Sequence, residues 1–286
     1  MKILRTVEDM RRWSMTERRA GKTIAFVPTM GALHEGHLSL LRAGKERADR
    51  LVLSIYVNPT QFGPKEDLGS YPRDFDGDLG KAEGTGVDAV FFPSDEAMYP
   101  KGYETFVTVE EVTKHLCGAS RPGHFRGVTT IVAKLFNIVA PDVALFGEKD
   151  FQQLVVIKKM AADLNMPIEI VGYPIVREPD GLAMSSRNQY LSREERQAAL
   201  SLSRALDEAG LIVEGGETRA AQILAQVRAT IEATKIVRID YAELVDAETL
   251  TGVERIKGRA LLALAAFVGK TRLIDNRLLR FSLPPK

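Results

Sequence analysis

The chain has 286 residues, of which 45% are hydrophobic and 27% are charged, and its formal net charge is +1. This composition supports a sizeable core and two domains and excludes a globally disordered chain, while the balanced charge gives no support for a nucleic-acid or membrane partner. The single cysteine, Cys117, excludes an internal disulfide and a zinc site made of thiolates. Because the sequence has no apolar run of about 18 residues or more and no apolar signal segment, we expect a cytoplasmic protein.

Residues 1–175 alternate strand-like and helix-like segments. Apolar or β-branched runs typical of strands fall at residues 24–27, 51–57, 87–93, 142–146 and 168–175, and helical apolar spacing falls at residues 37–50, 129–139 and 151–165. This alternation predicts an α/β fold with a Rossmann-like parallel sheet covered by helices on both faces. Such sheets bind ligands beyond the carboxyl ends of their strands. The site is therefore expected in the loops after Val27, Val57, Phe92, Phe146 and Ile175.

Residues 176–286 have a different pattern and predict a smaller α+β domain, with the boundary near Val176. Long helical patterns fall at residues 192–211 and 218–234, and strand-like runs follow at residues 238–245 and 260–268. Ser192 is followed three positions later by Glu195, which predicts a capping box at the start of the first helix.

The segment 28–37 reads Pro-Thr-Met-Gly-Ala-Leu-His-Glu-Gly-His and joins the first predicted strand to a leucine-rich helix. His34 and His37 therefore lie where a helix begins, among free N–H groups and the positive end of the dipole. This environment attracts phosphate and disfavours a protonated imidazole, so we expect both histidines to act as neutral donors. Gly36 leaves room for close approach of a nucleotide. The alternative is that the two histidines only cap the helix.

A His-x-Gly-His sequence after the first strand is the signature of the nucleotidylyl-transferase superfamily, which includes the class I aminoacyl-tRNA synthetases. The longer segment 28–37 resembles the pantothenate synthetase family. Further segments resemble that family in its order and at its spacing, at residues 56–62, 71–74, 121–128, 146–153 and 184–188, with weaker likeness at residues 239–241 and 273–276.

The resemblance implies an enzyme of pantothenate biosynthesis, an ATP-dependent ligase that condenses pantoate with β-alanine. Pantoate would first attack ATP to give pantoyl adenylate and pyrophosphate, and the amine of β-alanine would then release pantothenate and AMP. The resemblance also implies a homodimer, Mg²⁺ bound with ATP, and a C-terminal domain that acts as a lid. No nucleic-acid or membrane partner is expected.

Two glutamines follow predicted strands, and an amide can accept from a hydroxyl and donate to a carboxylate at once. The resemblance implies that Gln61 and Gln153 bind pantoate, with Met30 and Phe62 packing on its methyl groups. The alternative for each glutamine is an ordinary surface position.

The resemblance also assigns the ATP site and the catalytic residues, which are His34, His37 and Lys149. Contacts to ATP are implied for Met30, His34, His37, Gly147, Lys149, Asp150, Val176, Met184, Ser185, Ser186 and Arg187. Taken alone, Lys149 and Asp150 could be a solvated charge and a helix cap, and residues 185–187 could be an ordinary linker. The resemblance implies instead that residues 185–187 correspond to the mobile Lys-Met-Ser-Lys-Ser loop of class I synthetases.

Two further groups of charged residues are open to more than one interpretation. Arg121, His124 and Arg126 lie in a predicted loop, where they could steer phosphates or a carboxylate or form a charged surface. Asp78 is the expected Mg²⁺ ligand, although Gly77 stands where the family more often has a second adjacent acid, and an acidic helical stretch is commonly a solvated face.

Three other functions use parts of the same pattern. A nucleotidylyl transferase that stops at the adenylylated product needs the histidines but not the segments around Gln61 and Gln153. A relative of the aminoacyl-tRNA synthetases needs a basic surface, which the charge does not supply. A regulatory protein could bind nucleotide without chemistry. No Gly-x-Ser-x-Gly elbow occurs, and the sequence assigns no role to Cys117.

Overall fold

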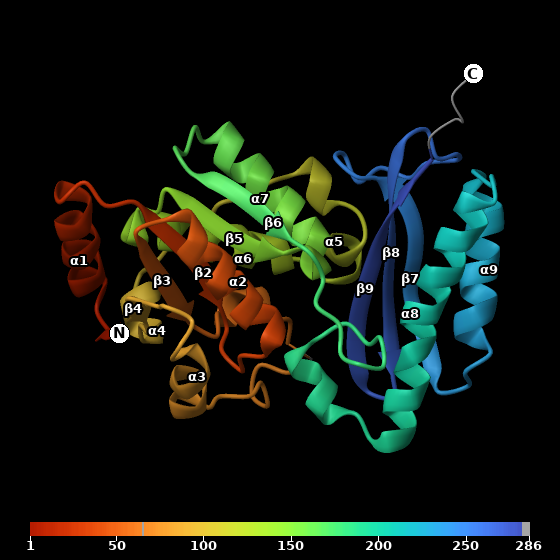
Figure 1. Cartoon of the computed structure of the whole chain (residues 1–286), viewed down its shortest axis with the longest axis horizontal. Helices are drawn as coiled ribbons and strands as arrows, with labels where there is room; N and C mark the ends of the chain where they lie inside the picture. Colours follow the sequence, from red (N-terminus) through yellow and green to blue (C-terminus); the bar gives the residue numbers. More distant parts are fainter. Residues whose placement is uncertain (65, 282–286) are drawn as a thin grey trace. The chain divides into compact units, whose positions relative to one another are not determined.

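The structure is a computed structural model that describes residues 1–64 and 66–281. The chain forms two compact units, whose elements are labelled in Figure 1. The first unit contains Met1–Glu110, Arg121–Glu148 and Gln153–Val176, and the second contains Glu111–Ser120, Lys149–Gln152 and Arg177–Lys286. Two short segments that precede Val176 in the sequence thus belong to the second unit. The division into domains at residues 175 and 176 stays a prediction, and residues 282–286 of the second domain lie outside the described residues.

The first unit is built on a parallel sheet. Its strands are β1 (Lys2–Leu4), β2 (Ile24–Thr29), β3 (Arg50–Ile55), β4 (Ala89–Phe91), β5 (Val143–Gly147) and β6 (Glu169–Tyr173). Within the described residues, the order across this sheet is β1-β4-β3-β2-β5-β6, and all neighbouring strands are parallel. The chain moves outward on one side from β2 and on the other from β5, so the topological switch point lies between these two strands. Ligands bind such sheets at the carboxyl ends of the strands beside the switch point.

Helices cover both faces of this sheet (Figure 1). They are α1 (Val7–Arg19), α2 (Glu35–Arg47), η1 (Pro59–Gln61), α3 (Phe75–Ala82), α4 (Asp95–Met98), α6 (His124–Val139) and α7 (Phe151–Asp163). Successive residues of a strand point to opposite faces. Ala25 and Val27 of β2 join Leu41 of α2 in one buried cluster, whereas Phe26 meets the ring of Phe136 in α6 edge-on at 6.5 Å. The predicted α/β fold is confirmed.

The sequence prediction for the first unit missed the helices α1, α3 and α4 and the strand β1, and it misplaced the start of α6. Residues 121–128, predicted as a loop, contain the first turn and a half of α6, which begins at His124 after Gly123 in a left-handed conformation. Helix α3 was not predicted, because Gly77, Gly80 and its acidic residues are weak helix formers. Strand β1 was missed because it has only three residues, two of them exposed, and so carries no periodic signal.

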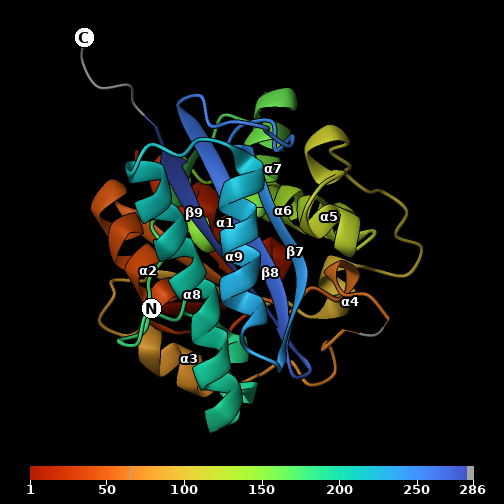
Figure 2. The same cartoon turned by 90° about the vertical axis from the view of Figure 1, so that its right-hand side faces the viewer.

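The second unit is an antiparallel sheet covered by two helices. The strands β7 (Val237–Asp246), β8 (Arg259–Val268) and β9 (Thr271–Arg280) lie in sequence order, and α8 (Arg193–Glu214) and α9 (Ala220–Glu232) run side by side over them (Figure 2). The unit also contains η2 (Glu111–Thr113), α5 (Cys117–Ser120), η4 (Ser186–Tyr190) and the last two residues of η3 (Glu148–Asp150). Its core includes Leu202, Ile223 and Leu262. The predicted α+β character is confirmed.

The capping box of α8 is also confirmed. The N–H of Glu195 donates to the Ser192 hydroxyl at 3.2 Å, and the Glu195 carboxylate accepts from the N–H of Ser192 at 2.8 Å. Among the residues that the structure describes, no helix combines the length and the apolarity needed to cross a membrane.

Candidate active site

The histidine loop, residues 30–37, follows β2 at the switch point. His34 is the N-cap of α2, and both His34 and His37 are half-buried. The N–H of Gly36 donates to Nδ1 of His34 at 3.2 Å, and the N–H of His34 donates to Nδ1 of His37 at 3.3 Å. The two imidazoles thus cap the helix reciprocally, with their ring centroids 4.1 Å apart. The prediction that both lie at a helix start is confirmed.

These hydrogen bonds fix the tautomer of both rings. An Nδ1 atom that accepts a hydrogen bond carries no proton, so the hydrogen of each neutral ring is on Nε2. A second proton would have to displace a main-chain donor and would stand against the positive end of the α2 dipole. His34 and His37 are therefore arranged as neutral Nε2–H donors, which is the form that stabilises negative charge on phosphate.

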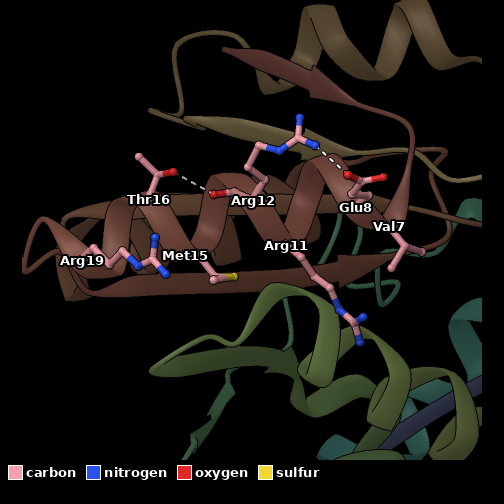
Figure 3. Close-up of a pocket in the computed structure, with 7 residues that line it drawn as sticks. All are labelled: Val7, Glu8, Arg11, Arg12, Met15, Thr16 and Arg19. Carbon is pink, nitrogen blue, oxygen red and sulfur yellow. Dashed lines mark hydrogen bonds and ion pairs between the residues drawn. The ribbon is translucent and has the colours of Figure 1, made fainter.

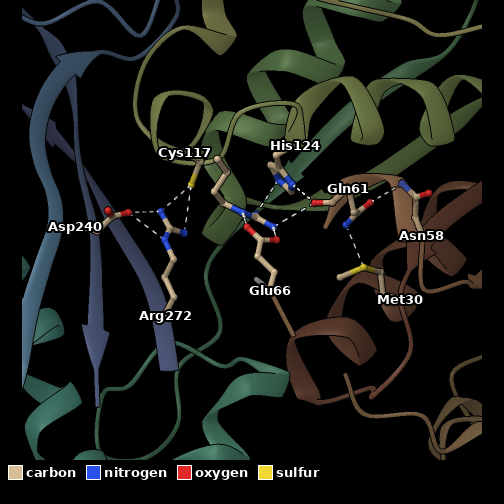
Figure 4. A network of polar contacts seen from close by, with 9 residues as sticks. Met30, Asn58, Gln61, Glu66, Cys117, His124, Asp240 and Arg272 are labelled. Atoms are coloured by element: carbon tan, nitrogen blue, oxygen red, sulfur yellow. Dashed lines mark hydrogen bonds and ion pairs between the residues drawn. The ribbon is translucent and has the colours of Figure 1, made fainter. Parts of the chain in front are cut away.

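A second group of side chains follows β3 and surrounds Gln61 (Figure 4). The Nε2 of Gln61 donates to Sδ of Met30 at 3.1 Å, and the Oε1 of Gln61 accepts from Nδ2 of Asn58 at 3.0 Å. Phe62, the next residue, meets the ring of Tyr71 edge-on at 5.8 Å. The structure therefore brings together Met30 and Gln61 from the predicted pantoate residues and orients the Gln61 amide by two contacts.

Asn58 was not among the predicted site residues, yet it organises this group. It is 1% exposed, and its Nδ2 also donates to the carbonyl of Gly127 at 3.2 Å. Its Oδ1 accepts from the hydroxyl of Tyr99 at 2.8 Å, and burial raises the pKa of that hydroxyl to about 12. The signal available in the sequence was an asparagine directly after the predicted strand 51–57, whereas its burial and its fixed partners are seen only in the structure.

Gln153, the other predicted pantoate residue, lies in α7 of the first unit and is half-buried. Its side chain makes no hydrogen bond within residues 1–64 and 66–281. The neighbouring Gln152 is 6% exposed and has a structural role in the second unit, where its amide bonds three main-chain groups of residues 112–117. Gly147, predicted to contact ATP, ends β5 beside the switch point.

The basic residues of the predicted loop are not a free cationic cluster. Arg121 forms a two-pronged ion pair with Glu66, at 2.7 and 2.5 Å, and this pair holds the pKa of Glu66 below its ordinary value despite the opposing effect of burial. His124 Nδ1 donates to the carbonyl of Gln61 at 2.8 Å, so its Nε2 accepts from Arg121 at 3.1 Å. Arg126 instead lies 3.6 Å over the ring of Phe106. Arg121 and His124 therefore hold the main chain of Gln61 in place.

Asp78, the predicted Mg²⁺ ligand, is 1% exposed. Its two carboxylate oxygens accept from the N–H groups of Ala32 and Leu33 at 2.8 and 2.7 Å. Burial raises its pKa, and these two hydrogen bonds oppose the increase. Within the described ranges, no three His, Cys, Asp or Glu residues form a group that could hold a metal ion. This environment does not fit a resident magnesium ion, which prefers several oxygen ligands and bound water.

The remaining predicted ATP contacts lie in the second unit, except for half-buried Val176, which ends the first. Lys149 and Asp150 form η3, where the Asn276 amide donates to the carbonyl of Lys149 at 2.9 Å. In the described part of the chain, neither charged side chain has an ion pair or a hydrogen bond. Met184 is half-buried, as are Ser185, Ser186 and Arg187.

The segment with Ser185 is held by polar contacts inside the second unit. The Ser185 hydroxyl accepts from the N–H of Arg187 at 3.3 Å, capping η4. The Asn188 amide donates to Glu178 at 2.6 Å, and Arg196 of α8 pairs with the same carboxylate at 2.6 Å. This support fixes the base of a segment that carries two hydroxyls and a guanidinium.

Cys117 also has a structural place in the second unit. Its Sγ lies 3.2 Å from the hydroxyl of Tyr241. The same Sγ lies 3.6 Å from Nη2 of Arg272, which pairs with Asp240 at 2.7 Å (Figure 4). Burial raises the pKa of Tyr241, and the neighbouring thiol raises it further. The Cys117 N–H donates to Gln152 at 2.9 Å. These contacts tie residues 111–120 to the antiparallel sheet.

A surface groove lies along the exposed side of α1 (Figure 3). It encloses about 470 Å³ and is lined by Val7, Glu8, Arg11, Arg12, Met15, Thr16 and Arg19. Arg12 forms an ion pair with Glu8, with 2.6 Å between Nη2 and Oε1. None of the lining residues belongs to the predicted site, and the groove lacks the convergent polar groups of a substrate pocket.

Known proteins resemble this chain over nearly its whole length. The sequence model of the family described as Pantoate-beta-alanine ligase matches residues 2–278. A pantothenate synthetase from Syntrophus aciditrophicus is 59% identical over 278 residues, which cover 97% of each chain. The crystal structure of pantothenate synthetase from Thermus thermophilus is 43% identical, with a TM-score of 0.92 over 97% of this chain and 99% of that chain. A structure of pantoate-beta-alanine ligase from Francisella tularensis, complexed with beta-gamma ATP and beta-alanine, is 32% identical, with a TM-score of 0.81 over 97% of both chains. The chain belongs to the pantoate-beta-alanine ligase family.

Proposed function

We propose that this ligase joins pantoate to β-alanine at the expense of ATP through a pantoyl-adenylate intermediate. The main support for this intermediate is the pair of Nε2–H donors, His34 and His37, at the start of α2. Donors placed at a helix N-terminus stabilise the negative charge that develops on departing pyrophosphate. The described site residues include no serine elbow or thiol aimed at a substrate, so catalysis by orientation and charge stabilisation is the chemistry that fits.

The reaction has two steps. In the first, a pantoate carboxylate oxygen forms a bond to the α-phosphorus of ATP, and the bond from that phosphorus to the pyrophosphate oxygen breaks. In the second, the amine of β-alanine attacks the acyl carbon of the mixed anhydride, AMP leaves with the bonding electrons, and the amine loses a proton to solvent. His34 and His37 lower the barrier of the first step by donating hydrogen bonds to phosphate oxygens.

Pantoate binding is assigned to the group around Gln61. The contact from Asn58 leaves the Gln61 amide in a fixed orientation, in which it can exchange its weak bond to the Met30 sulfur for a bond to substrate oxygen. Met30 and Phe62 supply apolar surface for the methyl groups of pantoate. Gln153, whose side chain has no hydrogen bond within the described ranges, supplies a second amide.

The second unit supplies further contacts to ATP in this proposal. Lys149 neutralises phosphate charge and is the third catalytic residue, while Ser185, Ser186 and Arg187 clamp the phosphates. Asp150 is assigned to the nucleotide. The same assignment covers Gly147, Val176 and Met184.

The substrates are pantoate, β-alanine and ATP, the last as its magnesium complex. The Francisella tularensis relative was complexed with beta-gamma ATP and beta-alanine, which supports two of these three. Magnesium enters with the nucleotide substrate, because the surroundings of Asp78 do not fit a resident ion. The cytoplasmic location and the homodimer stay predictions of the family resemblance and the sequence.

An isotope experiment tests the intermediate. Pantoate labelled with ¹⁸O in its carboxylate is incubated with the enzyme, ATP, Mg²⁺ and β-alanine, and the products are analysed by mass spectrometry. Attack on the α-phosphorus places one ¹⁸O atom in AMP. Unlabelled AMP, or label found in inorganic phosphate beside ADP, contradicts the adenylate.

A further inference from the structure

We propose that Asp78, assisted by Lys81, is a positioning residue that fixes the main chain of the histidine loop, and that it is not a ligand of the magnesium ion that accompanies ATP. The catalytic consequence of this inference rests on the proposed function. Its geometric basis lies entirely within the first unit and does not depend on the reaction.

Four successive main-chain N–H groups lead from β2 into α2, and each has a side-chain acceptor. They belong to Gly31, Ala32, Leu33 and His34. The outer two use neighbours in the sequence, the hydroxyl of Thr29 at 3.2 Å and the ring of His37 at 3.3 Å. The middle two both use Asp78, which comes from α3. Asp78 is therefore the long-range support on which the path of the loop depends.

The backbone of this loop is strained at Ala32, whose N–H donates to Asp78. Gly31 and Ala32 have φ values of 81° and 49°, both in the left-handed region. An alanine in that region costs about 1 kcal/mol, and such a conformation persists only where the surroundings over-determine it. The two hydrogen bonds from Ala32 and Leu33 to one buried carboxylate provide that determination.

Lys81 lies three residues after Asp78 and so occupies the same side of α3. Its Nζ donates to the carbonyl of Leu33 at 2.9 Å, so α3 offers an acceptor and a donor to the same short stretch of main chain. Helix α3 is held in turn by Phe75, whose ring stacks on that of Phe92 at 4.0 Å. The support therefore runs from the end of β4, through α3, to the residue that precedes His34.

The same contacts argue against a magnesium ligand at this position. Both Asp78 oxygens are directed at main-chain N–H groups, and the residue is 1% exposed. The ammonium of Lys81 acts on the same carboxylate electrostatically. Magnesium keeps several water molecules and demands octahedral geometry, for which a buried, doubly bonded carboxylate is a poor donor.

In the first test, NMR measures the hydrogen exchange of single amides in Asp78→Asn, in Lys81→Met and in the control Asp74→Asn. An asparagine at position 78 can accept from one of the two N–H groups but presents its own N–H₂ to the other. We expect exchange at Ala32 or Leu33 to accelerate by about tenfold or more in Asp78→Asn. Asp74→Asn removes a charge from the same helix while keeping an N-cap acceptor, so exchange in the loop should not change.

The second test is kinetic. In Asp78→Asn we expect kcat to fall by about 10- to 100-fold, because the Nε2–H groups of His34 and His37 are no longer held in the orientation that reaches phosphate. The dissociation constant for pantoate and the magnesium concentration that gives half-maximal activity should stay at wild-type values. Asp74→Asn should keep the wild-type kcat.

Two results would overturn the inference. One is unchanged exchange of the Ala32 and Leu33 amides in Asp78→Asn. The other is recovery of its activity at high magnesium, which is the behaviour of a metal ligand. If the wild-type protein has no pantoate-dependent activity, the proposed function fails, whereas the exchange measurement still decides whether Asp78 holds the loop.

Discussion

At the scale of single residues, His34 combines two roles that a substitution can separate. Its Nδ1 caps α2, and its Nε2–H is the proposed donor to phosphate. Asparagine is a preferred N-cap residue and retains an acceptor, but it cannot reach as far as Nε2. We expect His34→Asn to keep the thermal stability of the wild type while kcat falls by about 100- to 1000-fold, as on loss of an oxyanion donor.

His34→Ala is the matched comparison, because it loses both roles. Its kcat should fall as far as that of His34→Asn, and its unfolding free energy should drop by about 1 kcal/mol with the cap. Steady-state kinetics and urea unfolding measure the two effects. Wild-type kcat in His34→Asn contradicts a role for the imidazole beyond capping.

At the scale of elements, the close approach of α6 to η1 positions the Gln61 group. A Cβ atom on Gly127 would lie 2.3 Å from the carbonyl oxygen of Thr60 and 2.7 Å from Cα of Gln61. Gly127→Ala must therefore push η1 away, and we expect the KM for pantoate to rise by about tenfold or more. The KM for ATP should change little.

Gly80→Ala is the control for this substitution, because it also adds a methyl group to a helical glycine. A Cβ at Gly80 meets no atom within 4 Å. That variant should keep the pantoate KM and gain up to about 1 kcal/mol of stability from helix propensity. Equal pantoate KM values in the two variants contradict the proposed role of the contact.

The Glu66–Arg121 pair gives the same region a dependence on pH. Arg121 depresses the pKa of Glu66 in the folded protein below its ordinary value of 4.5, with burial acting in the opposite direction. The pair therefore contributes stability that is complete above pH 4.5 and is lost as the pH falls through the lower, folded-state pKa. Glu66→Gln should be less stable than the wild type at neutral pH, and the difference should shrink in acid.

Urea unfolding at a series of pH values measures this difference. Glu104→Gln, an exposed carboxylate of the same unit with no ion pair in the described part of the chain, should keep the wild-type profile. A Glu66→Gln difference that stays constant from neutral pH into acid shows that the pair does not set the pH dependence.

At the scale of the whole molecule, the features predicted from the sequence are those formed by residues that lie close together in the sequence. The histidines adjoin the helix that they cap, and the apolar runs of the strands identify the parallel sheet. The supports join distant segments instead. Asp78 reaches Ala32 and Leu33 across more than 40 residues, and Arg121 reaches Glu66 across 55. No local pattern encodes such pairs.

For the same reason, the sequence did not reveal which short segments belong to the second unit. Residues 111–120 belong to the second unit because Gln152 bonds their main chain and Cys117 contacts Tyr241 and Arg272. Composition gives no sign of these contacts. The family resemblance supplied the chemistry, which periodicity alone could not, because a His-x-Gly-His sequence also suits a helix cap.

If the enzyme activates pantoate as an adenylate, it must catalyse ATP–pyrophosphate exchange in the absence of the amine. The assay contains ATP, Mg²⁺, labelled pyrophosphate and pantoate, without β-alanine. We expect label to enter ATP only when pantoate is present, and we expect His34→Asn to abolish most of this exchange. Absence of pantoate-dependent exchange, in folded protein that binds ATP, contradicts the adenylate mechanism.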